Sequence, residues 1–288
     1  MNTASSPPYF QSAPYNVRSS IFTQQQLITP DTLTEDIEEG DPVTAEPSSG
    51  DFLHLSARLG HERIASKLLL DLEPGAIDCE NLYSGDTALH EAARRGNLCL
   101  VNVLLEQGAK ISVQNHVGNY PLHLAAEEGH IAVIKNLLEK GASREAVNQD
   151  SFTPLHLAIK NRPLEAVETL LEGQVAEIIA IKNTTGQNMA LDCALRNFNE
   201  DIIKKLVEFG ADLDTKDEMG QTLLHDLASR GLTEAVSLLC GLGASSYIED
   251  KENRTALYLA ARGGHGATFQ ELARARNLNL NRPIVFWP

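Results

Sequence analysis

One phrase recurs along this chain at intervals of 33 or 36 residues, and this period constrains the fold more than any other feature. In its clearest form, residues 151–158, the phrase reads Ser-Phe-Thr-Pro-Leu-His-Leu-Ala. Other features keep the same spacing: a glycine often follows seven residues after the shared leucine, and a Gly-Ala pair often follows nineteen after it. The shared leucine stands at Leu53, Leu89, Leu122, Leu155, Leu191, Leu224 and Leu257. Seven positions on one lattice indicate an array of repeated units.

Each unit reads as a pair of helices. In the unit quoted above, Thr153 is a good N-cap and Pro154 a good first helical residue, so a helix should begin there. The leucine and the small residues after it form one apolar face. In the units that carry them, the first glycine should end the first helix in a left-handed turn, and the Gly-Ala pair should end a second helix. A single unit cannot bury its own apolar face, so the units must stack into a solenoid.

This pattern resembles the ankyrin repeat, whose period is 33 residues and whose signature is Thr-Pro-Leu-His-x-Ala. The resemblance covers residues 51–276. It implies an all-α ankyrin-repeat solenoid of about seven helix–turn–helix repeats with hairpin tips. In such a fold, partners usually lie across the hairpin tips and the first helices.

The two ends differ from the array. Residues 1–50 are an acidic segment rich in Ser, Thr, Pro and Gln, with few large apolar residues, and we expect a disordered tail. Residues 277–288 include the run Pro-Ile-Val-Phe-Trp-Pro, which is either an apolar cap on the last helix pair or the truncated end of a longer array. Within the array, Arg162 and Phe198 replace the turn glycine in the fourth and fifth units, where we expect the softest part of the stack.

Charge and cysteine content restrict the function. The formal net charge is −15, so the chain should not attract nucleic acid or an anionic membrane. No apolar stretch is long enough for a transmembrane helix, and we expect no secretory signal at the N-terminus. Four scattered cysteines then indicate reduced thiols. We expect a monomer in the cytoplasm, the nucleus or both.

Nine histidines invite a metal or acid–base hypothesis, but eight of them follow the repeat. Five occupy the slot after the shared leucine and three follow the turn glycine. The resemblance implies that the first group hydrogen-bonds locally within the repeats. No metal-binding, nucleophile-elbow or phosphate-loop motif occurs in the sequence. We therefore expect no catalytic residue, no cofactor and no metal, and predict that the chain is not an enzyme.

One group of charged residues stands out against the negative total. The resemblance implies that the two residues closing the first helix face the concave groove, and six of seven units place a basic residue there. A solvated helix end, favoured by the helix dipole, explains this row as well as a groove for an acidic partner segment does. The residues assigned to partner binding are Arg94, Arg95, Lys160, Arg196, Arg230 and Arg262.

The hairpin tips complete the predicted site, with Tyr83 and Phe152 as the anchors. The tip residues are Tyr83, Asp86, His116, Asn119, Gln149, Phe152, Met219, Gln221, Lys251 and Arg254. We predict a non-enzymatic adaptor, scaffold or inhibitor that binds a protein partner on the concave face. Two alternatives remain open: a regulatory subunit of an enzyme or transcription complex, and a fragment of a longer ankyrin array.

Overall fold

The computed structural model describes residues 49–70, 72, 75–161, 163–173, 179–181 and 189–278. Within these residues the chain is helical, apart from one isolated β-bridge between Glu249 and Thr255, so the predicted all-α class is confirmed. The predicted tail, except its last two residues, and the end segment, except its first two, lie outside the described residues. The first described helix begins at Ser49, two residues before the predicted start of the array.

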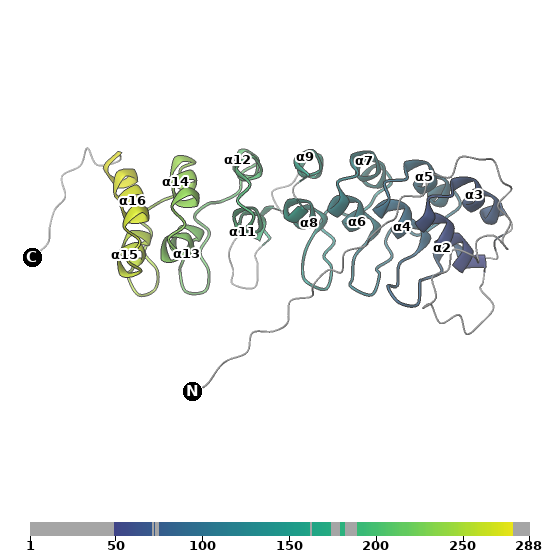
Figure 1. Ribbon diagram of the computed structural model, residues 1–288, viewed down its shortest axis with the longest axis horizontal. Coiled ribbons are helices and arrows are strands. Elements are labelled where there is room, and N and C mark those ends of the chain that lie inside the picture. Colours follow the sequence, from purple (N-terminus) through teal and green to yellow (C-terminus); the bar gives the residue numbers. More distant parts are fainter. Residues whose placement is uncertain are drawn as a thin grey trace, which may run out of the picture. The chain divides into compact units, whose positions relative to one another are not determined.

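The helices form pairs, and each pair is one unit of the array. The first helices of the units are α2 (Ser49–Leu59), α4 (Ala88–Arg94), α6 (Pro121–Glu128), α8 (Pro154–Asn161), α11 (Met189–Arg196), α13 (Leu223–Ser229) and α15 (Ala256–Arg262). The second helices are α3 (Glu62–Leu70), α5 (Leu98–Glu106), α7 (Ile131–Glu139), α9 (Leu164–Leu171), α12 (Glu200–Glu208), α14 (Thr233–Gly241) and α16 (Gly266–Leu278). A short 3-10 helix, η1 (Ala76–Asp78), precedes α4. Figure 1 shows the two sets as two layers, with loops projecting on the side of the first helices.

In α4, α8 and α13 the repeated phrase starts the first helix with a contact between the cap threonine and the histidine three residues later. In α4, the amide and hydroxyl of Thr87 both lie within hydrogen-bond distance of His90 Nδ1, at 3.1 and 3.0 Å. The corresponding distances from Thr153 to His156 in α8 are 3.0 and 2.8 Å. Each histidine thereby holds the cap residue at the start of its own helix.

The turn between the two helices of a unit requires a left-handed residue. Gly129 ends α6 with φ 78°, which glycine adopts at little cost. Phe198 occupies the same position after α11 and is held at φ 42°. A side chain in this region costs about 1–2 kcal/mol, so the fifth unit carries local strain that the glycine-containing units avoid.

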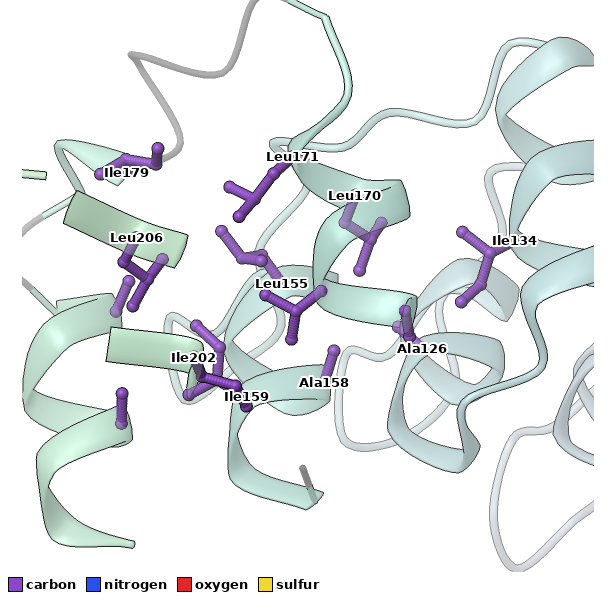
Figure 2. Packing of buried hydrophobic residues seen from close by; sticks show 14 of the residues in the cluster. Ala126, Ile134, Leu155, Ala158, Ile159, Leu170, Leu171, Ile179, Ile202 and Leu206 are labelled. Carbon is purple, nitrogen blue, oxygen red and sulfur yellow. The ribbon is translucent and has the colours of Figure 1, made fainter. Parts of the chain in front are cut away.

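The core runs continuously between the layers because each unit contributes the same apolar positions. The shared leucines Leu89, Leu122 and Leu155 are almost fully buried, and the alanines three residues later allow neighbouring first helices to pack closely. Figure 2 shows this packing around Leu155, with Ala126 and Ile134 of the third unit on one side and Ile202 and Leu206 of the fifth on the other.

Asparagine and aspartate side chains shape the projecting tips. Asn115 Oδ1 accepts hydrogen bonds from the amides of Val117 and Asn119, and Asn148 Oδ1 accepts two in the same way in the next unit. Tips also pack against one another: a Cβ on Gly118 would lie 2.7 Å from the Gln149 amide nitrogen. The tips therefore form a connected row.

One junction in the stack is looser than the others. First helices of neighbouring units are in close contact elsewhere, whereas α11 with α13, and α12 with α14, approach each other less closely. A cleft of about 610 Å³ lies between α12 and α14, lined by Phe198, Leu238 and Leu242 among others. Leu227 of α13, which is buried, stands where five other units have alanine, so the sixth unit carries a bulkier side chain in the first-helix layer.

Candidate partner-binding surface

Three of the five histidines after the shared leucine, His90, His123 and His225, donate a hydrogen bond to the next unit. Nε2 of His54 and of His156 is buried without a partner among the described residues. Nδ1 of His90 accepts from the Thr87 amide, so the ring proton sits on Nε2, which donates to the Asn119 carbonyl of the next unit at 3.0 Å. His225 repeats both contacts with Thr222 and Arg254. Burial lowers the pKa of His123 to about 4. The three bonded imidazoles are neutral, and their role is to join one unit to the next.

A second set of bonds fixes the ends of the first helices, where the basic row was predicted. His130 Nε2 donates to the Arg94 carbonyl at 2.8 Å, and His265 Nε2 donates to the Ser229 carbonyl at 2.9 Å. In the units without a turn glycine, an asparagine amide takes over this contact, as from Asn197 to the Lys160 carbonyl at 3.0 Å. The backbone of the row is therefore held in place by the following unit.

The structure divides the predicted tip residues into two groups. Those with exposed side chains are Tyr83, His116, Gln149, Met219 and Lys251. Those that are buried or half-buried are Asp86, Asn119, Phe152, Gln221 and Arg254. Only the first group has side chains in the exposed class.

The buried group links neighbouring tips. Asn115 Nδ2 donates to Asp86 Oδ1 at 2.7 Å, and Asn148 Nδ2 donates to Asn119 Oδ1 at 2.8 Å. Near the other end of the stack, Gln221 Nε2 donates to Asp250 Oδ2 at 3.1 Å. Asp86 and Asn119 are thus engaged within the stack and not displayed at its surface, because the next tip supplies a donor that covers each of them.

Asp86 also holds one member of the basic row. Arg94 Nη2 lies 2.7 Å from Asp86 Oδ2, and Arg94 Nη1 lies 2.8 Å from Glu91 Oε1. Burial opposes ionisation of Asp86, but the hydrogen bond from Asn115 and the Arg94 charge outweigh it and keep the pKa below its ordinary value. Arg94 therefore joins the end of α4 to the base of the hairpin, and its charge is neutralised locally.

The rest of the basic row is also divided. Arg196 pairs with Asp192 at 3.1 Å, and Arg230 pairs with Asp226 at 3.0 Å, each one turn away on its own helix. Three exposed cations form no ion pair within the part of the chain that the structure describes: Arg95, Lys160 and Arg262. In the third unit the row carries Glu127, whose pKa is raised by burial and by the Glu128 charge. The row is a set of separated cations and not one uniform basic groove.

Sequence reasoning missed two exposed apolar residues at the tips, Leu82 at 88 % and Val117 at 55 % exposed. They belong with Tyr83, exposed to 62 %, and Met219, exposed to 51 %. Turns are usually polar, so an apolar residue inside an Asn- and Gly-containing turn was the available signal. We call Leu82, Tyr83, Val117 and Met219 the apolar tips.

Chemistry beyond binding has little support in the described residues. They contain no group of three or more His, Cys, Asp or Glu side chains placed to hold a metal ion. Burial raises the pKa of the Cys193 and Cys240 thiols to about 11, which disfavours a nucleophilic thiolate. Among the same residues, every helix is too short or too polar to cross a membrane.

The comparison with protein families agrees with the architecture. The family model for ankyrin repeats (3 copies) matches residues 29–115, 93–180 and 190–283, which is most of the chain. Among curated proteins, the chain is 44 % identical over 62 residues to the probable 26S proteasome regulatory subunit p28 of Saccharomyces cerevisiae, and 40 % identical over 62 residues to human Rabankyrin-5. These matches span 21 % and 22 % of this chain, but only 27 % and 5 % of the two relatives.

Solved structures match over a longer stretch. The ankyrin repeat domain of Bcl-3, described as a unique member of the IkappaB protein family, superimposes with a TM-score of 0.67 at 27 % identity and covers 77 % of this chain and 97 % of that domain. The human ASB11 ankyrin repeat domain gives 0.62 at 27 % identity, covering 77 % and 96 %. Repeats of this kind generally form non-enzymatic scaffolds for protein–protein interaction. The lattice, the two-layered helix pairs and the family match together establish that this chain belongs to the ankyrin-repeat family.

Proposed function

We propose that this protein is a non-enzymatic interaction module that binds a segment of a protein partner across the apolar tips and the adjacent ends of the first helices. The carrying observation is the exposure of the Leu82, Tyr83, Val117 and Met219 side chains. Neighbouring tips are joined here through the backbone carbonyls of Tyr83, Val117 and Met219, which leaves the side chains themselves accessible. Exposed apolar side chains lower the solubility of a protein, and burying them under a partner contributes favourably to the binding free energy. Tyr83 is the anchor that best fits this proposal, since tyrosine is enriched among residues that dominate binding energy.

The three unpaired cations suggest the chemistry of that partner. Arg95, Lys160 and Arg262 are exposed and free of intramolecular ion pairs within the described residues, although the whole chain carries a net charge of −15. They favour a partner segment that combines apolar anchors with acidic residues. The chain's own acidic stretch, residues 35–41, is the competing occupant of the same cations.

A location and an oligomeric state belong to the same proposal. The four cysteines are free thiols, as expected in a reducing compartment, and we assign the protein to the cytoplasm or nucleus on that ground. We assign it a monomeric state, with the partner as its ligand.

A second candidate is a regulatory subunit of a larger enzyme complex. The observation that favours it is the local similarity to a yeast protein described as a probable proteasome regulatory subunit. The two candidates share the binding surface and differ only in what the partner does. Identification of the bound protein distinguishes them.

The test uses the full chain as bait, with cross-linking to map the contact. The variant Leu82→Ser with Tyr83→Ser should lose the specific partner, because it removes two neighbouring apolar anchors, each worth about 1–2 kcal/mol of binding. The matched control is Leu70→Ser, which removes an equally exposed leucine on α3, in the other layer. Retention of the partner by the tip variant, or its loss from the control alone, would refute the assigned surface.

A further inference from the structure

The last unit of the stack exposes side chains that the same lattice positions bury in the other units. The slot after the shared leucine holds His90, His123 and His225, each at most 1 % exposed. In the seventh unit this slot holds Tyr258, and its exposed fraction is 53 %. The ring stands where the following unit would cover it.

The second helix shows the same contrast. Twelve residues after the shared leucine, six units carry an aliphatic residue that is fully buried: Ala65, Val101, Ile134, Val167, Ile203 and Val236. The seventh unit carries Phe269 there, and it is 40 % exposed. Ala261, on α15 between these two rings in sequence, is exposed as well, whereas Ala93, Ala126 and Ala228 at its lattice position are fully buried. We call Tyr258, Ala261 and Phe269 the end face.

An end face of this composition needs a cover. The outer surface of a terminal repeat is normally polar, because no further unit shields it from water. Here the two aromatic rings leave roughly 200 Å² exposed, given that aromatic side chains bury 150–250 Å² each when covered. Within the part of the chain that the structure describes, the hydrogen bond at Tyr258 runs from its backbone amide to Thr255 Oγ1 and does not involve the ring.

We propose that residues 279–288 of this chain occupy the end face, with the apolar side chains of residues 284–287 on Tyr258 and Phe269. The segment begins directly after α16, so it is tethered to the unit that it would cover. Ten extended residues span about 33 Å, which is more than the width of two packed helices. The segment contains Ile284, Val285, Phe286 and Trp287 in one run, a composition suited to an aromatic surface.

The tether favours this occupant over a second copy of the chain. A segment joined by a few residues acts at an effective concentration in the millimolar range, far above that of another molecule in solution. The two prolines that flank the run, Pro283 and Pro288, also limit the conformations lost on docking. In this proposal the segment shields the end face of its own chain from water.

Trp287 makes the proposal directly testable, because it is the only tryptophan in the chain. In the full-length protein, its fluorescence should be blue-shifted and protected from acrylamide, compared with a peptide of residues 279–288. Tyr258→Ser with Phe269→Ser should shift the emission back towards that of the peptide. Tyr258→Ser alone, at a half-exposed site with little risk to folding, should give part of the same shift. The control Leu70→Ser with Tyr83→Ser removes comparable exposed groups at the far end and should leave the emission unchanged.

A Trp287 that is quenched as easily in the folded chain as in the peptide overturns the proposal, as does an emission that ignores both end-face variants while circular dichroism shows intact helices. Protection that appears only as the protein concentration rises assigns the end face to a second copy and also overturns it. Concentration-independent protection that is lost in the end-face variants establishes intramolecular docking.

Discussion

At the scale of single residues, two aspartates that each pair with an arginine should contribute very differently to the free energy of unfolding. Asp86 is almost fully buried between Asn115 and Arg94, whereas Asp226 pairs with Arg230 in water. Asp86→Ala would leave a buried amide and a guanidinium without their acceptor, and should lower the free energy of unfolding by about 2–4 kcal/mol. Asp226→Ala removes only an exposed pair and should cost no more than about 1 kcal/mol.

Denaturant unfolding of the two variants, monitored by circular dichroism, measures this difference. Both substitutions delete the same atoms from an acid that pairs with an arginine, so the change in side-chain size is matched. Asp226 lies within α13 and Asp86 lies before α4, so only Asp226→Ala also gains helix propensity, by less than about 1 kcal/mol. Equal losses of stability would mean that the ladder between the tips contributes nothing beyond a surface ion pair.

At the scale of elements, the junction between the fifth and sixth units departs from the repeat at two positions, one in each unit. At two other junctions a histidine ring lies over the turn glycine of the preceding unit: a Cβ on Gly96 would sit 2.5 Å from His130 Nδ1, and the same holds for Gly231 and His265. At the fifth turn Phe198 replaces that glycine, and Leu232 replaces the histidine. The two departures are coupled, because a side chain at the turn excludes the ring.

We therefore predict that Phe198→Gly and Leu232→His together stabilise the stack by more than the sum of the two single changes. The pair relieves the strained φ and allows a new hydrogen bond to the Arg196 carbonyl, for a gain of about 1–2 kcal/mol. Leu232→His alone should be neutral or destabilising. A double-mutant cycle measured by thermal unfolding gives the coupling, and hydrogen exchange in α12 and α14 should slow in the double variant. Additive effects of the two changes would contradict the proposed coupling.

At the scale of the whole molecule, the buried histidines make stability depend on pH. Burial lowers the pKa of His54, His90, His123, His156 and His225 from 6.5, to about 4 for His123 and His156. Their neutral forms are favoured in the folded state, so this contribution is complete above pH 6.5 and falls as the pH drops towards 4. By pH 5, His123 and His156 should each cost on the order of 2 kcal/mol.

Thermal unfolding between pH 7 and pH 5 tests this. The melting temperature should fall steadily, and His123→Gln should flatten the slope even though the variant is less stable at pH 7. A melting temperature that is constant across this range would show that the imidazoles do not titrate with unfolding.

The distribution of charge over the whole chain leads to a prediction about binding. Because the cations of the row are separated and the total charge is negative, the unpaired cations should act mainly through orientation and association rate. Arg95→Glu with Arg262→Glu should weaken binding to an identified partner more at low salt than at high salt. Arg230→Glu, at a cation that already pairs with Asp226, should have a smaller effect. If Arg95→Glu with Arg262→Glu leaves the affinity and its salt dependence unchanged, the basic row consists only of solvated helix ends.

Much of this architecture was readable from the residues alone. The leucine lattice, the threonine caps and the turn glycines act within a few residues of one another, so their spacing predicts the helix pairs, and the fold class follows from stacking them. The histidines were also assigned to structure by their place in the phrase, and His90 and His225 lie where that assignment requires. Local hydrogen bonding and apolar periodicity depend only on residues that are close in sequence, so the sequence alone is enough to predict them.

The roles of the tip and row residues were decided only by the tertiary structure. Asp86 and Tyr83 stand three residues apart in one turn, yet one is buried and the other exposed. The difference arises because Asn115, 29 residues later, reaches Asp86 from the next tip. Arg94 and Arg95 differ in the same way, since within the described residues only Arg94 reaches a carboxylate. Exposure and pairing depend on what the neighbouring unit places opposite each side chain, and that geometry exists only once the units are stacked.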